Sequence, residues 1–392
     1  MTIGVPAETF PGERRVAMTP RALETLAKIN ASCLVESGAG AAAGFPDSEY
    51  ESKGARIARR RADVFGESEV ILQVRTAGAD PGSLVNDLPL LRSSHVVIGF
   101  GEPLSSASEY AAYAARGVTS FAMELIPRIT RAQSMDALSS MATVAGYKAA
   151  LLAADGLPRM FPMLMTAAGT ITPARVFVLG AGVAGLQAIA TARRLGAVVT
   201  AYDVRAAVRE QIESLGARFV SIGMETVQAE ERGGYARELG EDFYRRQREV
   251  LTGVVEQQDV VIATAAVPGR KAPVLITAEM VARMAPGSVV VDLAAERGGN
   301  CALTAPGRTV VESGVTILGP LNLPSTVPYH ASQMYSRNLA MFVRHLAPEG
   351  AISIRLDDPI IRETLVTWGG QVVHPRLQEM PALPADTIVQ GD

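Results

Sequence analysis

The sequence predicts an α/β protein that consists of two doubly wound, Rossmann-like domains with a cleft between them. Short β-branched runs alternate with helix-like stretches along almost the whole chain, which is typical of parallel α/β structure. A glycine-rich turn near residue 180 lies between two of the strand patterns, as in units that bind dinucleotides. The chain has 392 residues, enough for two or three domains of ordinary size.

The first third of the chain is predicted to form a doubly wound unit of its own. A helix is expected at 20–29, because Thr19 can cap it and Pro20 suits its first position, while Leu23 and Leu26 share one face. This unit has no glycine-rich turn, so we expect it to bind no dinucleotide. Its candidate strands are 2–5, 32–35, 70–74, 96–98 and 118–121.

A second doubly wound unit with about six strands is predicted to follow. A helix at 135–154, rich in small residues that permit close packing, precedes it and could bridge two domains. A helical stretch at 331–345 follows the last strand, and we expect the C-terminal part to return to the first domain. The predicted domains are therefore 1–136 with 328–392, and 137–327. The candidate strands of the second unit are 174–179, 197–203, 218–221, 259–264, 288–292 and 315–318.

Three glycines follow the first strand of the second unit. Gly180 permits a tight turn, Gly182 lets the backbone approach a pyrophosphate, and Gly185 allows close packing of helix on strand. The helix that begins near Val183 offers unpaired N–H groups to phosphates. Asp203 lies 23 positions after Gly180 (203 minus 180), where an acid accepts hydrogen bonds from ribose hydroxyls and repels a 2′-phosphate. The segment therefore predicts a site for NAD(H) rather than NADP(H).

Composition and charge exclude several classes of protein. A net charge of −3 does not fit a nucleic-acid binder. The two cysteines, Cys33 and Cys301, are too few for a disulfide scaffold or a cysteine-rich zinc site, and indicate a reducing, intracellular location. The N-terminus has no secretory signal, and no stretch approaches the roughly 18 uninterrupted apolar residues of a transmembrane helix. We expect a cytoplasmic, metal-free protein that reaches a membrane only through other polypeptides.

A long charged segment interrupts the second unit at 222–247. Gly234 and Tyr235 lie at its centre. A solvated loop with a surface helix would explain the charges. A mobile flap that closes on a ligand would explain the glycines, with Tyr235 as the closing contact, because long loops in compact domains are often functional.

Polar residues gather just before the second unit, at 127–140. If a helix starts near Ser134, then Asp136 and Ser139 share one face and could point into the cleft together. A helix capped by Ser134 would explain the same residues without a site. A dehydrogenase for alcohols or amino acids usually needs a histidine or lysine as acid or base, and this cluster contains neither. We interpret as structural all four histidines, His95, His330, His345 and His374.

Eight segments occur along the chain in a characteristic order. They read PAETFPGERRVAMTP, PRITRAQSMDALSS, GAGVAGLQA, YDVR, GGYARELGEDFYRRQ, KAPVLIT, VDLAAERGGNC and HASQMYSRNLA. In this order the chain resembles the NAD(H)-binding component of proton-translocating NAD(P) transhydrogenase. The resemblance implies hydride transfer between NADH and NADP, with NADP(H) held on a partner subunit, coupled to proton passage through a membrane-spanning subunit. It also implies a homodimer on the cytoplasmic side of the inner (plasma) membrane.

The resemblance further implies roles for individual residues. Arg128, Asp136 and Ser139 would orient the nicotinamide carboxamide, and Gln133 would reach toward the partner nucleotide. A hydride that passes between two nicotinamides releases no proton at the reacting carbon, so a site that only orients the rings needs no acid or base. The residues implied around the rest of NAD(H) are Asp203, Val204 and Arg205 at the adenosine ribose, Gly234, Tyr235 and Gln247 in the flap, and Ala266 after the strand that ends near residue 264.

Two alternatives remain open at this point. Alanine dehydrogenase has a similar two-domain plan and an arginine like Arg15 that could hold a substrate carboxylate. Where its catalytic lysine is expected, however, this chain has Arg75, which cannot act as a base at neutral pH. A non-catalytic regulator that binds NAD(H) would also lack acid and base groups.

Overall fold

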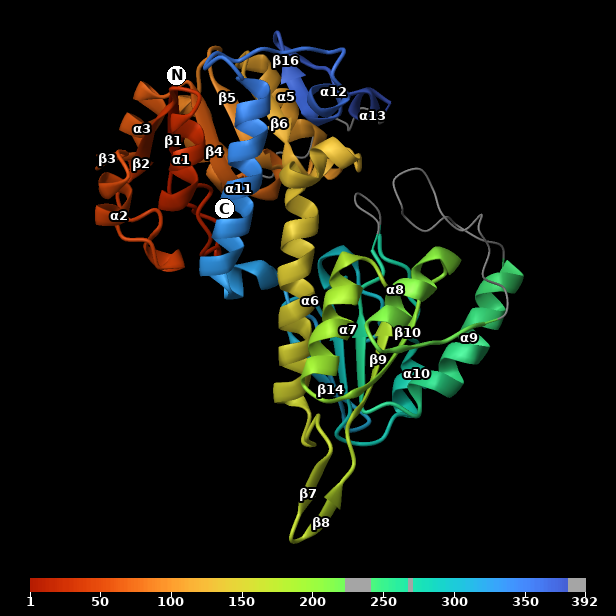
Figure 1. Cartoon of the computed structure of the whole chain (residues 1–392). Coiled ribbons are helices and arrows are strands. Elements are labelled where there is room, and N and C mark those ends of the chain that lie inside the picture. The colour runs from red at the N-terminus through yellow and green to blue at the C-terminus, as the bar shows by residue number, and fades with distance from the viewer. Residues whose placement is uncertain (223–240, 267–270, 380–392) are drawn as a thin grey trace, which may run out of the picture. The chain divides into compact units, whose positions relative to one another are not determined.

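The computed structural model describes residues 1–222, 241–266 and 271–379 (Figure 1). The chain divides into two compact units, each described here by itself. Unit 1 contains Met1–Met141 and Ser325–Asp392, and unit 2 contains Ala142–Pro324. Each unit is built on a mostly parallel sheet with helices packed against it. The predicted α/β class, with two doubly wound units, is confirmed.

The sheet of unit 1 has eight strands in the order β17-β16-β6-β5-β4-β1-β2-β3. Strands β1 to β6 are parallel, and their order reverses between β1 and β4, as in a doubly wound fold. The C-terminal segment adds β16, which runs antiparallel to β6, and β17. The strands are β1 Thr2–Val5, β2 Ser32–Glu36, β3 Arg56–Ala58, β4 Val70–Arg75, β5 Val96–Phe100, β6 Thr119–Ala122, β16 Leu365–Trp368 and β17 Gln371–Val372.

Helices cover the sheet of unit 1. Residues of α3, α4 and α5 pack into one apolar cluster with β2, β4 and β5. Helix α11 reaches the sheet through Phe342, whose ring centroid lies 5.5 Å from that of Phe121 in β6. The helix expected at 20–29 is a 3-10 turn, Pro20–Ala22, followed by the short α1. The helices are α1 Leu23–Ala27, α2 Asp47–Ser52, α3 Arg61–Glu67, α4 Pro81–Asp87, α5 Ala107–Ala115, α11 Pro328–Leu346, α12 Pro359–Thr364 and α13 Pro375–Gln378.

The sheet of unit 2 has seven strands in the order β11-β10-β9-β12-β13-β15-β14. Six are parallel and reverse order between β9 and β12, whereas the unpredicted edge strand β14 is antiparallel to β15. A separate hairpin, β7 Leu164–Thr166 and β8 Gly169–Ile171, precedes the sheet. The strands are β9 Arg175–Leu179, β10 Val198–Tyr202, β11 Arg218–Phe219, β12 Val260–Ala263, β13 Val289–Asp292, β14 Thr309–Glu312 and β15 Val315–Leu318.

Two apolar layers cover this sheet. Residues of α6, α7 and α8 fill the layer on one face, and residues of α9 and α10 fill the layer on the other. Because side chains alternate along a strand, β9 contributes Val176 and Val178 to the first layer and Phe177 and Leu179 to the second. The helices are α6 Ala137–Gly156, α7 Val183–Arg194, α8 Arg209–Ser214, α9 Glu241–Val255 and α10 Ala278–Ala282.

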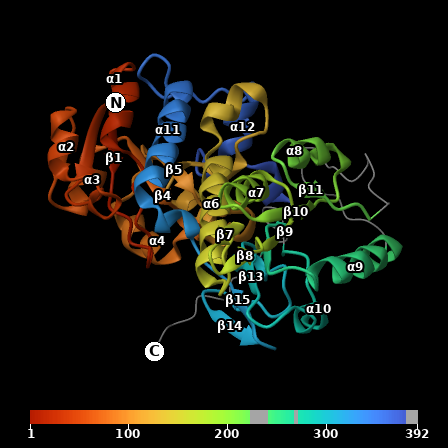
Figure 2. The same cartoon turned by 60° about the horizontal axis from the view of Figure 1, so that its bottom comes forward.

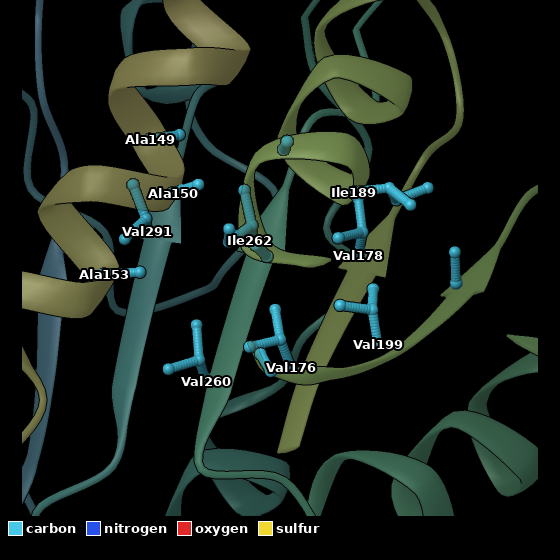
Figure 3. Packing of buried hydrophobic residues seen from close by; sticks show 14 of the residues in the cluster. Ala149, Ala150, Ala153, Val176, Val178, Ile189, Val199, Val260, Ile262 and Val291 are labelled. Carbon is cyan, nitrogen blue, oxygen red and sulfur yellow. The ribbon is translucent and has the colours of Figure 1, made fainter. Parts of the chain in front are cut away.

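Helix α6 carries the small residues that were expected to permit close packing. In the described part of the chain it is the one helix long and apolar enough to cross a membrane by length and composition. Its residues Ala149, Ala150 and Ala153 are fully buried in the first layer of unit 2 (Figure 3). A Cβ on Gly146 would lie 2.0 Å from the backbone oxygen of Ala184 in α7, and α6 and α7 lie side by side in Figures 1 and 2. These contacts make this part of α6 a core helix.

Candidate nucleotide site

The turn between β9 and α7 is shaped by two glycines. Gly180 has a φ of +94°, a left-handed conformation that favours glycine, and its N–H donates to the carbonyl of Tyr202 at 2.8 Å. A Cβ on Gly185 would lie 1.9 Å from the backbone oxygen of Gly180. The first turn of α7 can therefore lie against the end of β9 only because residue 185 has no side chain.

Gly182 and Val183 form the exposed side of the same turn. Apart from its two chain neighbours, no described residue has an atom within 4 Å of a Cβ on Gly182, and Val183, the first residue of α7, is exposed. The first turn of a helix leaves N–H groups without intrahelical partners, and its positive dipole end attracts anions. Space and donors thus coincide at Gly182, an arrangement that fits the pyrophosphate of a dinucleotide.

Asp203 follows β10 and is almost completely buried. Its Oδ2 accepts hydrogen bonds from the N–H of Ala181 at 2.8 Å and from Nη2 of Arg205 at 2.8 Å. Its Oδ1 accepts from the N–H and from Nε of Arg205, both at 2.9 Å. The structure therefore brings Asp203 and Arg205 together beside the glycine turn. The neighbouring Val204 packs against the second apolar layer.

Three residues around this turn were not singled out from the sequence. Oγ1 of Thr264, just after β12, donates to the carbonyl of Gly180 at 2.9 Å. Oδ1 of Asn300 accepts from the N–H of Ala265 at 2.9 Å, and its Nδ2 donates to the carbonyl of Ala265 at 2.8 Å. These bonds hold the backbone just before the exposed Ala266 against the turn. The sequence holds no signal for them, because they reach the turn only through the pairing of β12 with β9.

The structure describes only part of the charged segment at 222–247. Gly234 and Tyr235 lie outside the described residues. Gln247 lies on α9, so its assignment to a loop is wrong. The side chain of Gln247 is buried, and its Nε2 donates to the hydroxyl of Tyr202 at 3.1 Å. Because Tyr202 directly precedes Asp203, this bond supports the end of β10 from inside the core.

In unit 1, the polar segment before α6 is organised by Asp136. Its Oδ1 accepts the N–H of Ser139 at 2.8 Å, and its Oδ2 accepts the Ser139 hydroxyl at 2.6 Å. A side chain that accepts the N–H three residues further on is a helix cap. The cap of α6 is thus Asp136, and the expectation that Ser134 caps the helix is wrong. Arg128 and Gln133 lie exposed on the segment that leads to the cap.

Two histidines are held by contacts inside unit 1. Nε2 of His95 donates to the carbonyl of Phe65 at 3.0 Å, and burial lowers the pKa of His95. Nε2 of His345 lies 2.8 Å from a carboxylate oxygen of Asp358. The same carboxylate accepts a hydrogen bond from Nη2 of Arg131 at 2.9 Å. His345, in the last turn of α11, therefore joins a polar cluster with Asp358 and Arg131.

In unit 1, side chains occupy the place between β1 and β4 where the strand order reverses. Glu8, after β1, accepts the N–H groups of Val74 at 2.6 Å and Arg75 at 3.1 Å, and burial raises the pKa of Glu8 to about 8. Glu13 accepts Nε and Nη2 of Arg15 at 2.7 and 2.6 Å. It also accepts Nε of Arg75 at 3.1 Å. At the corresponding place in unit 2, Gly182 leaves space.

Comparison with known proteins identifies the family. Two family models match: alanine dehydrogenase/PNT, N-terminal domain, over 4–145, and its C-terminal domain, over 149–375. The chain is 45% identical to the first part of the NAD(P) transhydrogenase subunit alpha of Rhodospirillum rubrum, over 96% of this chain and 99% of that protein. It is 43% identical to NAD(P) transhydrogenase subunit alpha of Cereibacter sphaeroides, over 96% and 71%. A solved transhydrogenase structure from Sinorhizobium meliloti matches with a TM-score of 0.85 and 42% identity, over 95% of this chain and 100% of that chain. The chain therefore belongs to the alanine dehydrogenase/PNT family and, within it, to the NAD(P) transhydrogenase alpha subunits.

Proposed function

We propose that this chain is the NAD(H)-binding subunit of a proton-translocating NAD(P) transhydrogenase. A hydride passes directly between NADH on this chain and NADP on a partner subunit, and the transfer is coupled to proton translocation in another subunit. The observation that carries the proposal is the turn between β9 and α7, where Gly182 combines open space with helix N–H donors beside Asp203. The names of the relatives support the reaction.

Within this function, unit 2 binds the adenosine half of NAD(H). Asp203 accepts the ribose hydroxyls and disfavours a 2′-phosphate, and Val204 and Arg205 flank the ribose. Ala266 lines the nucleotide on the strand β12 side of the turn. Gly234 and Tyr235, which lie outside the described residues, are proposed to contact the nucleotide, and Gln247 supports the end of β10 through its bond to Tyr202.

The nicotinamide half is oriented by the segment before α6. Arg128, Asp136 and Ser139 contact the carboxamide, and Gln133 reaches toward the nucleotide of the partner. The bonds from Asp136 fix the side chain of Ser139, so its hydroxyl oxygen can accept from the carboxamide in a defined direction. Since hydride transfer between nicotinamides needs alignment rather than proton transfer, such orientation is the chief contribution expected of these side chains.

The chain is further proposed to act in a complex. Its partners are a membrane-spanning subunit and an NADP(H)-binding subunit, so it lies on the cytoplasmic side of the inner (plasma) membrane. The hairpin β7–β8 supports self-association as a homodimer, because Met163 just before it and Met165 on β7 are 58% and 81% exposed and isolated two-stranded hairpins are marginally stable. Met165→Lys should shift sedimentation toward the monomer, and unchanged sedimentation of this variant would count against the hairpin as the interface.

The alternative activity, alanine dehydrogenation, requires Arg15 to hold a substrate carboxylate. In unit 1 that guanidinium is bonded through two nitrogens to the buried Glu13, which also accepts from Arg75. The internal carboxylate of Glu13 thus occupies Arg15, and no lysine stands at position 75 to act as a base. These contacts favour the transhydrogenase.

The test is a pair of assays on the purified chain. Mixed with an NADP(H)-binding subunit, it should transfer hydride from NADH to a nucleotide analogue on that subunit, and it should not reduce pyruvate with ammonia and NADH. Hydride transfer to pyruvate would assign the chain to alanine dehydrogenase. Binding of NADH without transfer to any partner would favour the non-catalytic regulator.

A further inference from the structure

We infer that Arg205 is a specificity-determining residue: its side chain competes with the adenosine ribose for the Asp203 carboxylate and thereby weakens the preference for NAD(H) over NADP(H). The inference rests on the proposed NAD(H)-binding function and adds to it a side chain that opposes the choice Asp203 makes.

The hydrogen-bonding capacity of Asp203 is fully used in the structure. A carboxylate offers about four acceptor positions. Two are taken by the backbone N–H groups of Ala181 and Arg205, and two by Nε and Nη2 of the Arg205 side chain, all at 2.8 to 2.9 Å. A ribose whose hydroxyls bind Asp203 must therefore displace existing donors.

The two kinds of donor differ in how easily they can leave. The N–H of Ala181 belongs to the glycine turn and the N–H of Arg205 to the backbone after β10, so both remain unless the turn is rebuilt. The guanidinium of Arg205 is attached by a flexible side chain that is 15% exposed and can rotate away. Binding of NAD(H) is therefore expected to break the side-chain bonds and keep the backbone bonds.

Displacement of Arg205 affects the two coenzymes in opposite ways. For NAD(H), the ion pair with Asp203 must be broken, and this lowers affinity. For NADP(H), the displaced guanidinium remains next to the ribose, where it can pair with a 2′-phosphate through two N–H groups. Arg205 therefore offsets part of the repulsion between Asp203 and that phosphate.

The experiment measures dissociation constants of NADH and NADPH for the full chain by calorimetry at fixed ionic strength. Arg205→Gln removes the charge and should tighten NADH binding by about two- to fivefold, as expected for loss of a partly exposed ion pair, and weaken NADPH binding. Asp203→Asn keeps an oxygen for Ala181 but frees Arg205, so NADPH binding should tighten about tenfold or more and NADH binding should weaken. In the double variant, the gain for NADPH should disappear.

A matched control separates these effects from general loss of charge. Arg209 lies four residues further on, is exposed, and stacks over Phe219 with its guanidinium carbon 4.7 Å from the ring centroid. Arg209→Gln removes the same charge and should change the NADH-to-NADPH preference by less than about twofold. Thermal unfolding of every variant shows whether its fold is retained.

Three outcomes decide the question. Weaker or unchanged NADH binding in Arg205→Gln would overturn the inference, because the guanidinium would then assist or ignore the coenzyme. A double variant that keeps the NADPH gain of Asp203→Asn would overturn it too, since Arg205 would not be the phosphate partner. Failure of the unaltered chain to bind NADH would instead overturn the proposed function, and the inference with it.

Discussion

A methyl group added at Gly182 and one added at Gly185 should separate nucleotide binding from folding. Both glycines lie in the turn that starts α7, and each can be changed to alanine with the same gain of one carbon atom. Beyond its two chain neighbours, a Cβ at position 182 would meet no atom of the described residues within 4 Å, whereas a Cβ at position 185 would lie 1.9 Å from the backbone oxygen of Gly180.

The expected magnitudes follow from these distances. The contact at position 185 is 1.5 Å shorter than the ordinary 3.4 Å limit (3.4 minus 1.9), so α7 must move away from β9. Such overpacking costs about 1–3 kcal/mol, and the better helix propensity of alanine returns about 1 kcal/mol at most. Gly185→Ala should therefore destabilise unit 2 by roughly 1–2 kcal/mol and lower its Tm by about 2–8 °C.

Gly182→Ala should change stability little. The φ of −73° at Gly182 suits alanine, and the lower preference of alanine than of glycine for the N-cap position costs roughly 0.5 kcal/mol. The methyl group would occupy the place where the pyrophosphate approaches the backbone, so NADH binding should weaken about tenfold or more.

Two measurements check this pair: thermal unfolding followed by circular dichroism in the far ultraviolet, and NADH binding followed by coenzyme fluorescence. Gly182→Ala should lose binding at an almost unchanged Tm, while Gly185→Ala should lose Tm. Wild-type affinity in Gly182→Ala would refute the placement of the pyrophosphate. An unchanged Tm in Gly185→Ala would refute the close packing of α7 on β9.

Three further variants test other parts of the structure. Asn300→Ala leaves the N–H and carbonyl of Ala265 without their partner, so the free energy of unfolding in urea should fall by about 2–4 kcal/mol; a loss below about 1 kcal/mol would contradict this. Burial raises the pKa of folded Glu8 from 4.5 to about 8, so the protein should lose stability between about pH 5 and pH 8, by about 1.4 kcal/mol per pKa unit. Glu8→Gln should make this loss smaller, although Glu124, with a pKa raised by burial to about 7, should keep part of it. Identical pH profiles of the variant and the unaltered protein would refute the role of Glu8. Asp136→Asn keeps an oxygen for the helix cap, so the Tm should not change, but its amide nitrogen cannot accept the Ser139 hydroxyl, so hydride transfer to the partner should slow. Activity equal to that of the unaltered chain would show that Asp136 acts only as a helix cap.

The central parallel strands of both sheets and the edge strand β11 could be predicted from the sequence, whereas the edge strands β3 and β14 could not. Buried parallel strands such as β9 and β12 are continuous apolar runs, and this pattern is visible without tertiary information. Strand β14, with the sequence TVVE, is mostly exposed, and β3 has three residues. Both resemble loop sequence, because their strand conformation depends on a neighbouring strand that lies elsewhere along the chain.

The residues of the candidate site also differ in whether the sequence could reveal them. The glycines and Asp203 could be identified because their functions depend on local backbone geometry and fixed spacing. Thr264 and Asn300 could not, because they reach the turn only through strand pairing, and their bonds to Gly180 and Ala265 span 84 and 35 positions. The cap at Asp136 was misplaced by two residues because Ser134 and Asp136 are both good N-cap types, and the sequence alone does not fix where the helix begins.

The two units show why fold order alone does not locate the function. Both sheets reverse strand order after their first strand, which makes each unit a possible nucleotide binder. In unit 1 the reversal is closed by Glu8, which takes the backbone N–H groups of Val74 and Arg75 that a ligand would need. In unit 2 the glycine turn puts no side chain there, and Gly182 leaves open space. The two units therefore differ in whether side chains fill this topological position or leave it open, and so the proposed NAD(H) binding depends on Gly182 more than on the doubly wound fold.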